Sequence, residues 1–185
     1  MIKVALIGAH GSGKTTACLD IALGLKKEGV GVVKILDEVA TELPRLPGFA
    51  INESTTELAQ RYILLEQMRG EIFYEAKQNI DVLICDRGSI DNYAYFKRGG
   101  FSDSVLDSFV REHAKSYDAL FKIHPDSKYL KDDGIRSTSR PFQIEIDGIV
   151  TKILKEWNIP FDCYDGDPIL ASKKAVKKII NLMDR

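Results

Sequence analysis

Residues 8–15 of the chain read GAHGSGKT, and this stretch fits the pattern G-x-x-x-x-G-K-[ST]. In that pattern a glycine-rich turn aims successive backbone N–H groups at the phosphates of a nucleoside triphosphate. The apolar run Ile2–Ile7 comes directly before it and predicts a buried strand, while a helical pattern of apolar residues follows it. Because strand, glycine loop and helix form the context that the motif requires, the sequence predicts a phosphate-binding P-loop.

Each residue type in this loop suits a particular contact with a triphosphate. The first glycine allows a sharp turn off the strand, and the two later glycines allow bare backbone to approach an anion. Lys14 is expected to reach the β- and γ-phosphates as a point charge, and the Thr15 hydroxyl is expected to ligate Mg²⁺. His10 occupies a variable position, where an exposed side chain is expected. The positions assigned to the nucleotide are Gly8, His10, Gly11, Ser12, Gly13, Lys14, Thr15 and Thr16.

The composition fits one globular domain over residues 1–185. Of the 185 residues, 44% are hydrophobic and 29% are charged, which allows a sizeable core. The formal net charge is −1, so the charge balance favours neither a nucleic-acid surface nor a membrane surface. The chain leads straight into the first strand and has no apolar run long enough to span a bilayer, so we expect a cytoplasmic protein.

The cysteines Cys18, Cys85 and Cys163 form no C-x-x-C pair. Each falls inside an apolar helix or strand pattern, so we expect three buried, reduced thiols. Their odd number fits a reducing compartment. No spacing of histidines and cysteines suggests a metal-ligand set.

Further apolar runs alternate with helical patterns and predict four more strands, at Val32–Leu36, Asp81–Cys85, Ala119–His124 and Phe161–Tyr164. This alternation predicts an α/β fold in three layers, with a five-stranded parallel sheet between two layers of helices. Ligands of such sheets bind beyond the carboxyl ends of the strands. One edge of the sheet should therefore carry the P-loop together with Asp37, Glu38, Asp86, Arg87 and His124.

Charged pairs follow the second and third strands. Asp86 ends the apolar run VLIC, where a carboxylate can hold Mg²⁺ through water or accept a proton from an attacking hydroxyl; a helix cap is the simpler alternative. Arg87 cannot lose its charge, so it suits an anionic substrate or a developing phosphoryl charge, or else a surface ion pair. Asp37 or Glu38 could act as a general base or bind a substrate hydroxyl.

A long helix is predicted to begin at a cap on Asn52 or Ser54 and to run to about Gln78. Arg69 interrupts its apolar pattern; such a charge either reaches out to water or points into a pocket and holds a substrate. Gln60 carries two donors and an acceptor, which suit a planar base or an amide. The stripe expected to face inward consists of Leu58, Tyr62, Leu65, Ile72 and Ala76.

Residues 127–141 are polar and charged, and we interpret them as a lid. Arg136 and Arg140 lie four residues apart and share a face if the segment becomes helical. Phosphoryl transfer needs positive charge that is delivered as the site closes, which two lid arginines would supply, with Lys128 and Lys131 nearby. A solvated loop is the alternative interpretation.

These motifs together resemble the nucleoside and nucleotide kinases of the P-loop class, over nearly the whole chain. The run Asp86-Arg87-Gly88, followed by Asp91, Ala94 and Tyr95, is similar to that of a small AAA-domain family related to nicotinamide riboside kinase. The sequence departs from such kinases after the second strand, where Val39 rather than proline follows Glu38. The resemblance implies the strand order 2-3-1-4-5, substrate contacts at Gln60 and Arg69, lid arginines at Arg136 and Arg140, and a nucleotide base beside Gly166–Ile169, which includes Asp167 and Pro168.

The sequence therefore predicts an ATP- and Mg²⁺-dependent phosphotransferase that acts on a small acceptor bearing a hydroxyl or a phosphate. GTP stays open as the donor, although the guanine signature Asn-Lys-x-Asp is absent. A nucleotide-dependent switch with slow hydrolysis is the alternative, and a homodimer stays open. The predicted catalytic residues are Lys14, Glu38, Asp86, Arg87, Arg136 and Arg140; the predicted Mg²⁺ ligands are Thr15 and Asp86; and the predicted substrate contacts are Asp37, Glu38, Gln60, Arg69 and Arg87.

Overall fold

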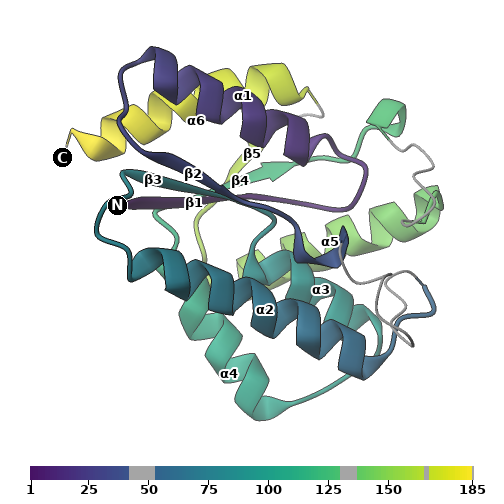
Figure 1. Cartoon of the computed structure of the whole chain (residues 1–185). Helices are drawn as coiled ribbons and strands as arrows, with labels where there is room; N and C mark the ends of the chain where they lie inside the picture. Colours follow the sequence, from purple (N-terminus) through teal and green to yellow (C-terminus); the bar gives the residue numbers. More distant parts are fainter. Residues whose placement is uncertain (42–52, 130–136, 165–166, 185) are drawn as a thin grey trace.

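A computed structural model describes residues 1–41, 53–129, 137–164 and 167–184. Strands and helices alternate along the chain (Figure 1). The strands are β1 (Ile2–Ile7), β2 (Val33–Leu36), β3 (Val82–Asp86), β4 (Ala119–Ile123) and β5 (Asp162–Tyr164). The α-helices are α1 (Lys14–Lys27), α2 (Glu57–Glu75), α3 (Ser89–Arg98), α4 (Ser104–His113), α5 (Arg140–Glu156) and α6 (Pro168–Met183). Short 3₁₀ helices include η1 (Val39–Thr41) and η4 (Ser127–Tyr129).

The five strands form one parallel sheet in the order β2-β3-β1-β4-β5, which confirms the predicted order. In the register of this sheet, Leu6 of β1 pairs with Asp86 of β3, and Ile7 pairs with Lys122 of β4. These three strands therefore end at the same edge of the sheet. The loops that leave them begin side by side, as expected for a ligand site in a parallel α/β fold.

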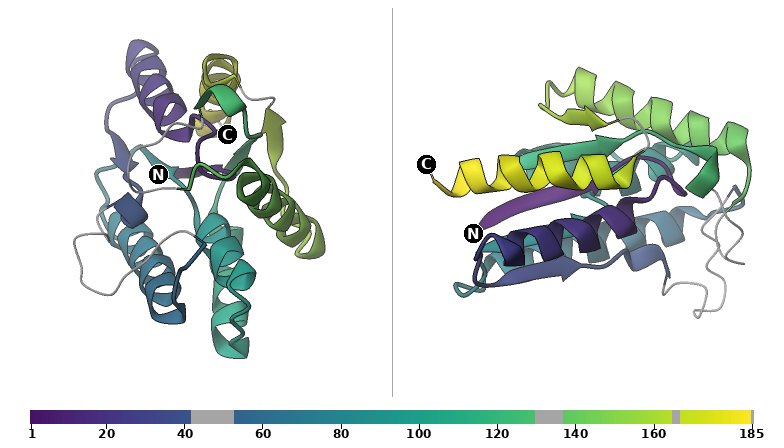
Figure 2. Two further views of the ribbon diagram at one scale, coloured as in Figure 1. Left: turned by 90° about the vertical axis from the view of Figure 1, so that its right-hand side faces the viewer. Right: turned by 90° about the horizontal axis from the view of Figure 1, so that it is seen from above.

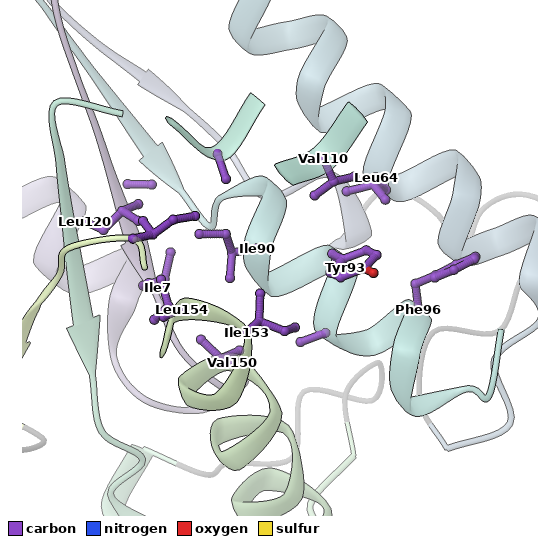
Figure 3. Packing of buried hydrophobic residues seen from close by; sticks show 14 of the residues in the cluster. Ile7, Leu64, Ile90, Tyr93, Phe96, Val110, Leu120, Val150, Ile153 and Leu154 are labelled. Atoms are coloured by element: carbon purple, nitrogen blue, oxygen red, sulfur yellow. The ribbon is translucent and has the colours of Figure 1, made fainter. Parts of the chain in front are cut away.

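Helices cover both faces of this sheet. Figures 1 and 2 show α1 and α6 on one face, and α2, α3 and α5 on the other. Alternate residues of β1 enter the two cores: Val4 and Leu6 pack on the side of α1 and α6, whereas Ala5 and Ile7 pack on the opposite side. Figure 3 shows this second core, where Ile90 of α3 lies among side chains of the sheet and of α5. Burial on both faces confirms the three-layer architecture.

Helix α2 buries a different face from the one predicted. The five residues expected to face inward are all exposed. The exposed fractions lie between 41% and 67% for Leu58, Tyr62, Leu65 and Ile72, and Ala76 is exposed as well. The buried face carries Ala59, Ile63, Leu64 and Met68 together with Gln60, Gln67 and Glu71. The prediction that the apolar stripe faces inward is therefore wrong, because α2 turns polar side chains inward to buried partners. Thr56 caps the helix by accepting a hydrogen bond from the Ala59 amide (3.2 Å), so the predicted cap at Ser54 is wrong. The other predicted cap, Asn52, lies outside the described residues.

The cysteines divide into two groups. Cys18 and Cys85 are buried as predicted, and burial raises the pKa of both thiols well above its usual value. Cys163 is exposed, so the prediction of a buried thiol is wrong there. The reason is that β5 is an edge strand of the sheet, which a short apolar run in the sequence cannot reveal.

Within the described residues, the helices are too short or too polar to cross a membrane. The cytoplasmic location stays a prediction. The single domain over residues 1–185 also stays a prediction.

Candidate active site

The loop between β1 and α1 has the backbone conformation that its three glycines suggest. Gly8, Gly11 and Gly13 have φ angles of +136°, +60° and +83°, in the region that side chains disfavour. A Cβ atom at Gly8 would lie 2.5 Å from the carbonyl oxygen of Ile123, and one at Gly13 would lie 2.9 Å from Cγ of Pro168. Glycine is thus needed at both positions for backbone conformation and for space.

Lys14 lies folded against this loop. Its Nζ donates to the carbonyl oxygens of Gly8 (3.0 Å) and Ala9 (2.6 Å) and to Oγ of Ser12 (3.2 Å). Burial, helped by the nearby charge of Arg87, lowers the pKa of Lys14 to about 8. The ammonium is therefore held beside the turn, where its charge is poorly solvated and an anion would stabilise it.

Thr15 and Asp86 form the candidate metal site. The Thr15 hydroxyl donates to Oδ2 of Asp86 over 2.5 Å, which joins the start of α1 to the end of β3. The other carboxylate oxygen, Oδ1, is buried and has no hydrogen-bond partner among the described residues, and burial raises the pKa of this carboxyl group. A hydroxyl and a carboxylate are the hard oxygen ligands that Mg²⁺ prefers, so both residues fit the predicted metal.

Glu38 and Arg87 form a buried ion pair between Nε of Arg87 and Oε1 of Glu38. Their side chains are only 7% and 4% exposed. Burial opposes the arginine's charge, but Glu38 and neighbouring groups outweigh it and hold the pKa of Arg87 above its usual value. The guanidinium also lies over the ring of Tyr95, 5.6 Å from its centroid. The two sequence motifs after β2 and β3 are thus brought together.

Two side chains that sequence reasoning did not place in the site hold the loop in position. Asp91 accepts hydrogen bonds from the backbone amides of Gly8 (2.6 Å) and Gly88 (2.9 Å), which ties the ends of β1 and β3 together. Gln143 of α5 donates to the carbonyl oxygens of His10 (2.6 Å) and Gly11 (3.0 Å). Asp91 entered the sequence argument only through the family resemblance, and Gln143 gave no signal because its partners are backbone atoms.

Two hollows adjoin at this edge of the sheet. The first, of about 510 Å³ counting space open to solvent, is the phosphate hollow, lined by Gly11, Ser12, Gly13, Lys14, Thr15, Thr16, Glu38, Asp86, Arg87 and Tyr129. The second, of about 400 Å³ on the same measure, is the acceptor hollow, lined by His10, Glu38, Ala40, Gln60, Ile63, Arg87, Asn92, Tyr95, Ser137 and Phe142. Glu38 and Arg87 belong to both, so the ion pair stands at their boundary.

His10 and Gln60 face the acceptor hollow. His10 is buried rather than exposed as expected: its Nδ1 lies 2.9 Å from the Tyr95 hydroxyl, which also accepts from the His10 amide (3.2 Å). The exposure predicted for a variable loop position fails because α3 and α5 close over it. Gln60 donates to Thr55 (2.8 Å), while its buried Oε1 has no hydrogen-bond partner among the described residues.

The structure does not bring every predicted residue to these hollows. Arg69 is 66% exposed and pairs with Glu66 on the surface of α2, so of the two alternatives the structure shows the one in which the charge reaches water. Asp37 is exposed and stands outside both sets of lining residues. Arg140 begins α5 and pairs with Gln143 and with the Pro125 carbonyl oxygen (3.3 Å), whereas Arg136 lies outside the described residues.

The turn predicted to lie beside a nucleotide base is described from Asp167 onward. Asp167 caps α6 by accepting hydrogen bonds from the amides of Ile169 (3.0 Å) and Leu170 (3.4 Å). Pro168 begins the helix and lies against Gly13, at the rim of the phosphate hollow. Gly166 lies outside the described residues.

The glycine loop between β1 and α1, the Thr15–Asp86 pair and this sheet order are the features of a P-loop NTPase. A family model described as an AAA domain matches residues 3–166, so the chain belongs to the AAA domain family. This confirms the predicted resemblance. No curated protein matches the chain.

Solved structures of a deoxyadenosine kinase from M. mycoides have the same fold. One, with the products dCMP and a flexible dCDP bound, is 18% identical, with a TM-score of 0.63 over 99% of each chain. Another, with bound dATP, is 19% identical, with a TM-score of 0.61 over 100% of each chain. At this identity the likeness establishes the fold that the two chains share.

Proposed function

We propose that the protein is an ATP- and Mg²⁺-dependent phosphotransferase that phosphorylates a hydroxyl group of a small acceptor. The observation that carries this proposal is the pair of adjoining hollows with Glu38 and Arg87 at their boundary. A nucleotide switch needs only the phosphate hollow. A kinase needs a second hollow beside it, close enough for direct transfer between two bound molecules.

In this proposal the chain's own groups position the donor. The loop amides and Lys14 hold the β- and γ-phosphates, with the Lys14 ammonium exchanging its carbonyl partners for phosphate oxygens. Thr15 and Asp86 hold Mg²⁺, which would neutralise charge on the phosphates. Arg87 adds a fixed positive charge at the boundary of the hollows, where negative charge develops during transfer.

Glu38 is the general base in this proposal. It lines both hollows, whereas Asp86 lines only the phosphate hollow and is already bonded to Thr15. The acceptor's hydroxyl proton passes to Glu38 as its oxygen bonds to the γ-phosphorus. The bond from that phosphorus to the bridging oxygen breaks, and the nucleoside diphosphate leaves. The two carboxylates that the sequence left as alternatives thus take different roles.

The acceptor is proposed to be a nucleoside or a molecule with a similar planar base. Tyr95 and Phe142 offer aromatic surface in the acceptor hollow, which suits stacking of a flat ring. The buried Gln60 Oε1 can accept a hydrogen bond from a base edge. The solved relatives of the same fold hold nucleotides, which supports this acceptor class.

The test is transfer of labelled γ-phosphate from ATP or GTP with Mg²⁺ to a pool of nucleosides, nucleoside monophosphates and pyridine ribosides. We expect a labelled organic product from the nucleosides, and at least about a hundredfold loss with Lys14→Ala. Labelled phosphate released slowly and unchanged by the pool would contradict the kinase and support the switch. Activity that survives Lys14→Ala would overturn the assignment of the loop.

We also propose that the protein forms a homodimer through the exposed face of α2. Leu58, Tyr62, Leu65 and Ile72 recur at spacings of four, three and seven residues, and together with Phe73 they leave an apolar stripe in water. Glu66 and Arg69 lie within this stripe as an ion pair. A second copy packed antiparallel across a two-fold axis would meet both charges with opposite ones, which suits self-association.

A further inference from the structure

Four side chains meet at the ends of β4 and β5, outside the residues that line the two hollows. Sγ of Cys163 lies 3.1 Å from Nε2 of His124, whose Nδ1 lies 3.3 Å from Oδ2 of Asp147 on α5. The other oxygen of Asp147 accepts a hydrogen bond from Nζ of Lys122 (2.7 Å). Sulfur, imidazole and carboxylate thus follow one another in a chain of polar contacts.

We propose that Cys163 is a nucleophilic thiol and a modification site for small-molecule disulfides, with His124 as its base and Asp147 orienting the imidazole. A nucleophile within reach of a base that a third group orients is the arrangement that activates thiols. The proposal goes beyond the phosphotransferase, since none of these side chains is assigned to that reaction.

The proposed step is thiol–disulfide exchange. The Cys163 proton passes to Nε2 of His124 while the sulfur attacks one sulfur atom of the disulfide R–S–S–R. A new S–S bond forms, the old one breaks, and the leaving thiolate takes a proton back from His124. The products are a mixed disulfide on Cys163 and the thiol R–SH, so atoms and electrons balance.

Lys122 fixes the carboxylate in this cluster. Its side chain is fully buried, and its Nζ bonds to Asp147 and lies 3.3 Å from Nδ1 of His124. Lys122 and Asp147 thus both lie at Nδ1 of the imidazole, whereas Cys163 lies at Nε2. The cations of α6 face the other side of β5: Lys178 pairs with Asp162 (2.6 Å), and Lys174 lies over the Tyr164 ring.

The remaining thiols provide internal controls. Cys163 is exposed to solvent, whereas Cys18 and Cys85 are buried, and burial raises the pKa of both. A small disulfide should therefore react with one cysteine of the folded chain and with the other two only after unfolding. Asp147 lies one helical turn beyond Gln143, so α5 carries both the orienting carboxylate of this cluster and a side chain that holds the P-loop.

The experiment measures the reaction of the native protein with excess dithiodipyridine, followed by the absorbance of the released thione. We expect one fast thiol per chain, absent in Cys163→Ser. His124→Asn should slow it by at least about tenfold at neutral pH. The wild-type rate should change little between about pH 6 and 8, while the variant's rate should rise steeply with pH, because only an unassisted thiol must ionise by itself.

His124 is 43% exposed, so its replacement should leave the fold intact, which circular dichroism would check. A rate and pH profile unchanged by His124→Asn would overturn the proposal. The proposal would also be overturned if the wild-type protein reacts with dithiodipyridine more slowly than N-acetylcysteine does and its rate rises as steeply with pH. This comparison needs no variant. Either result would make Cys163 an ordinary surface thiol.

Discussion

Arg87 joins the two halves of the candidate site at a conformational cost. Its φ angle is +84°, in a region that residues with side chains disfavour. Gln67 of α2 donates to its carbonyl oxygen (3.1 Å), and Glu38 pairs with its guanidinium. These contacts hold the backbone in the disfavoured region and place a permanent cation between the phosphate hollow and the acceptor hollow.

Replacing Glu38, the proposed general base, separates its role in phosphoryl transfer from any role in ATP binding. We expect Glu38→Gln to lower kcat by at least about a hundredfold while ATP binding persists, because the amide cannot accept the acceptor's proton. Steady-state kinetics with the acceptor found in the transfer assay would measure kcat, and a fluorescent ATP analogue would measure binding.

The matched control is Asp37→Asn, since Asp37 leaves the same strand but is exposed and outside both hollows. Its kcat should stay within about twofold of the wild type. The Glu38 variant leaves Arg87 unpaired in a buried position, so its thermal unfolding must be checked at the assay temperature. Equal losses in the two variants, or full activity in the Glu38 variant, would contradict the assignment of the base.

At the scale of elements, α2 shows how a buried polar face supports the sheet. Glu71 accepts hydrogen bonds from the Tyr117 hydroxyl (2.7 Å) and the Gln67 amide (2.8 Å), and its Oε2 lies 3.3 Å from Nζ of Lys3. His113 of α4 lies 2.8 Å from the same oxygen. The network fixes α2 and α4 against β1, and through Gln67 it reaches the backbone of Arg87.

This network predicts a particular dependence of stability on pH. Burial raises the pKa of Glu71, but the hydrogen bond from His113 and the charge of Lys3 outweigh it and leave the pKa below its usual value. A carboxyl group with a lowered folded-state pKa stabilises the fold above its unfolded pKa, and the stabilisation is lost as the pH falls through the folded value.

We therefore expect Glu71→Gln to lower the free energy of unfolding by about 3 kcal/mol at pH 7. The difference in free energy of unfolding between the wild type and the variant should become smaller as the pH falls below about 4.5. Urea titrations at several pH values would measure it, with Glu66→Gln, in the surface ion pair with Arg69, as a control that should change stability by less than about 1 kcal/mol. If this difference in free energy of unfolding does not change with pH, the charge of the Glu71 carboxylate is not what stabilises the buried polar face of α2.

At the scale of the whole molecule, the exposed apolar stripe on α2 allows a test of the proposed dimer. Leu65 lies near the middle of that stripe and is 49% exposed. Leu19, on α1 at the opposite face of the sheet, is exposed to a similar degree but stands outside the stripe (Figure 1). The two leucines therefore form a matched pair for testing the proposed dimer.

Sedimentation velocity at micromolar concentration should show a dimer for the wild type and for Leu19→Glu. Leu65→Glu should sediment as a monomer, because a two-fold contact would bring two like charges together in an apolar interface. A monomeric wild type would refute the dimer, as would a Leu65 variant that remains dimeric.

Local sequence was enough to predict the fold and the phosphate hollow. The P-loop, the runs of apolar strand residues and the shared edge of Thr15 and Asp86 all follow from short-range patterns, because a parallel sheet brings strand ends to one edge whatever the details of packing. The strand order came from family resemblance, and the structure confirms it. Residues adjacent to a strand end, such as Glu38 and Arg87, were placed correctly at that edge for the same reason.

The tertiary structure alone revealed what depends on contacts between distant segments. The inward face of α2, the burial of His10 and the exposure of Cys163 all differ from what local patterns suggest, and the surface position of Arg69 decides between two alternatives that the sequence left open. The polar inward face of α2 and the burial of His10 depend on side chains far along the chain, and the exposure of Cys163 follows from the edge position of β5. Periodicity carries no information about such neighbours. The same reason explains why the role of Gln143 emerges only when α5 packs beside the P-loop, and why the Cys163–His124–Asp147 cluster emerges only when β4, β5 and α5 come together.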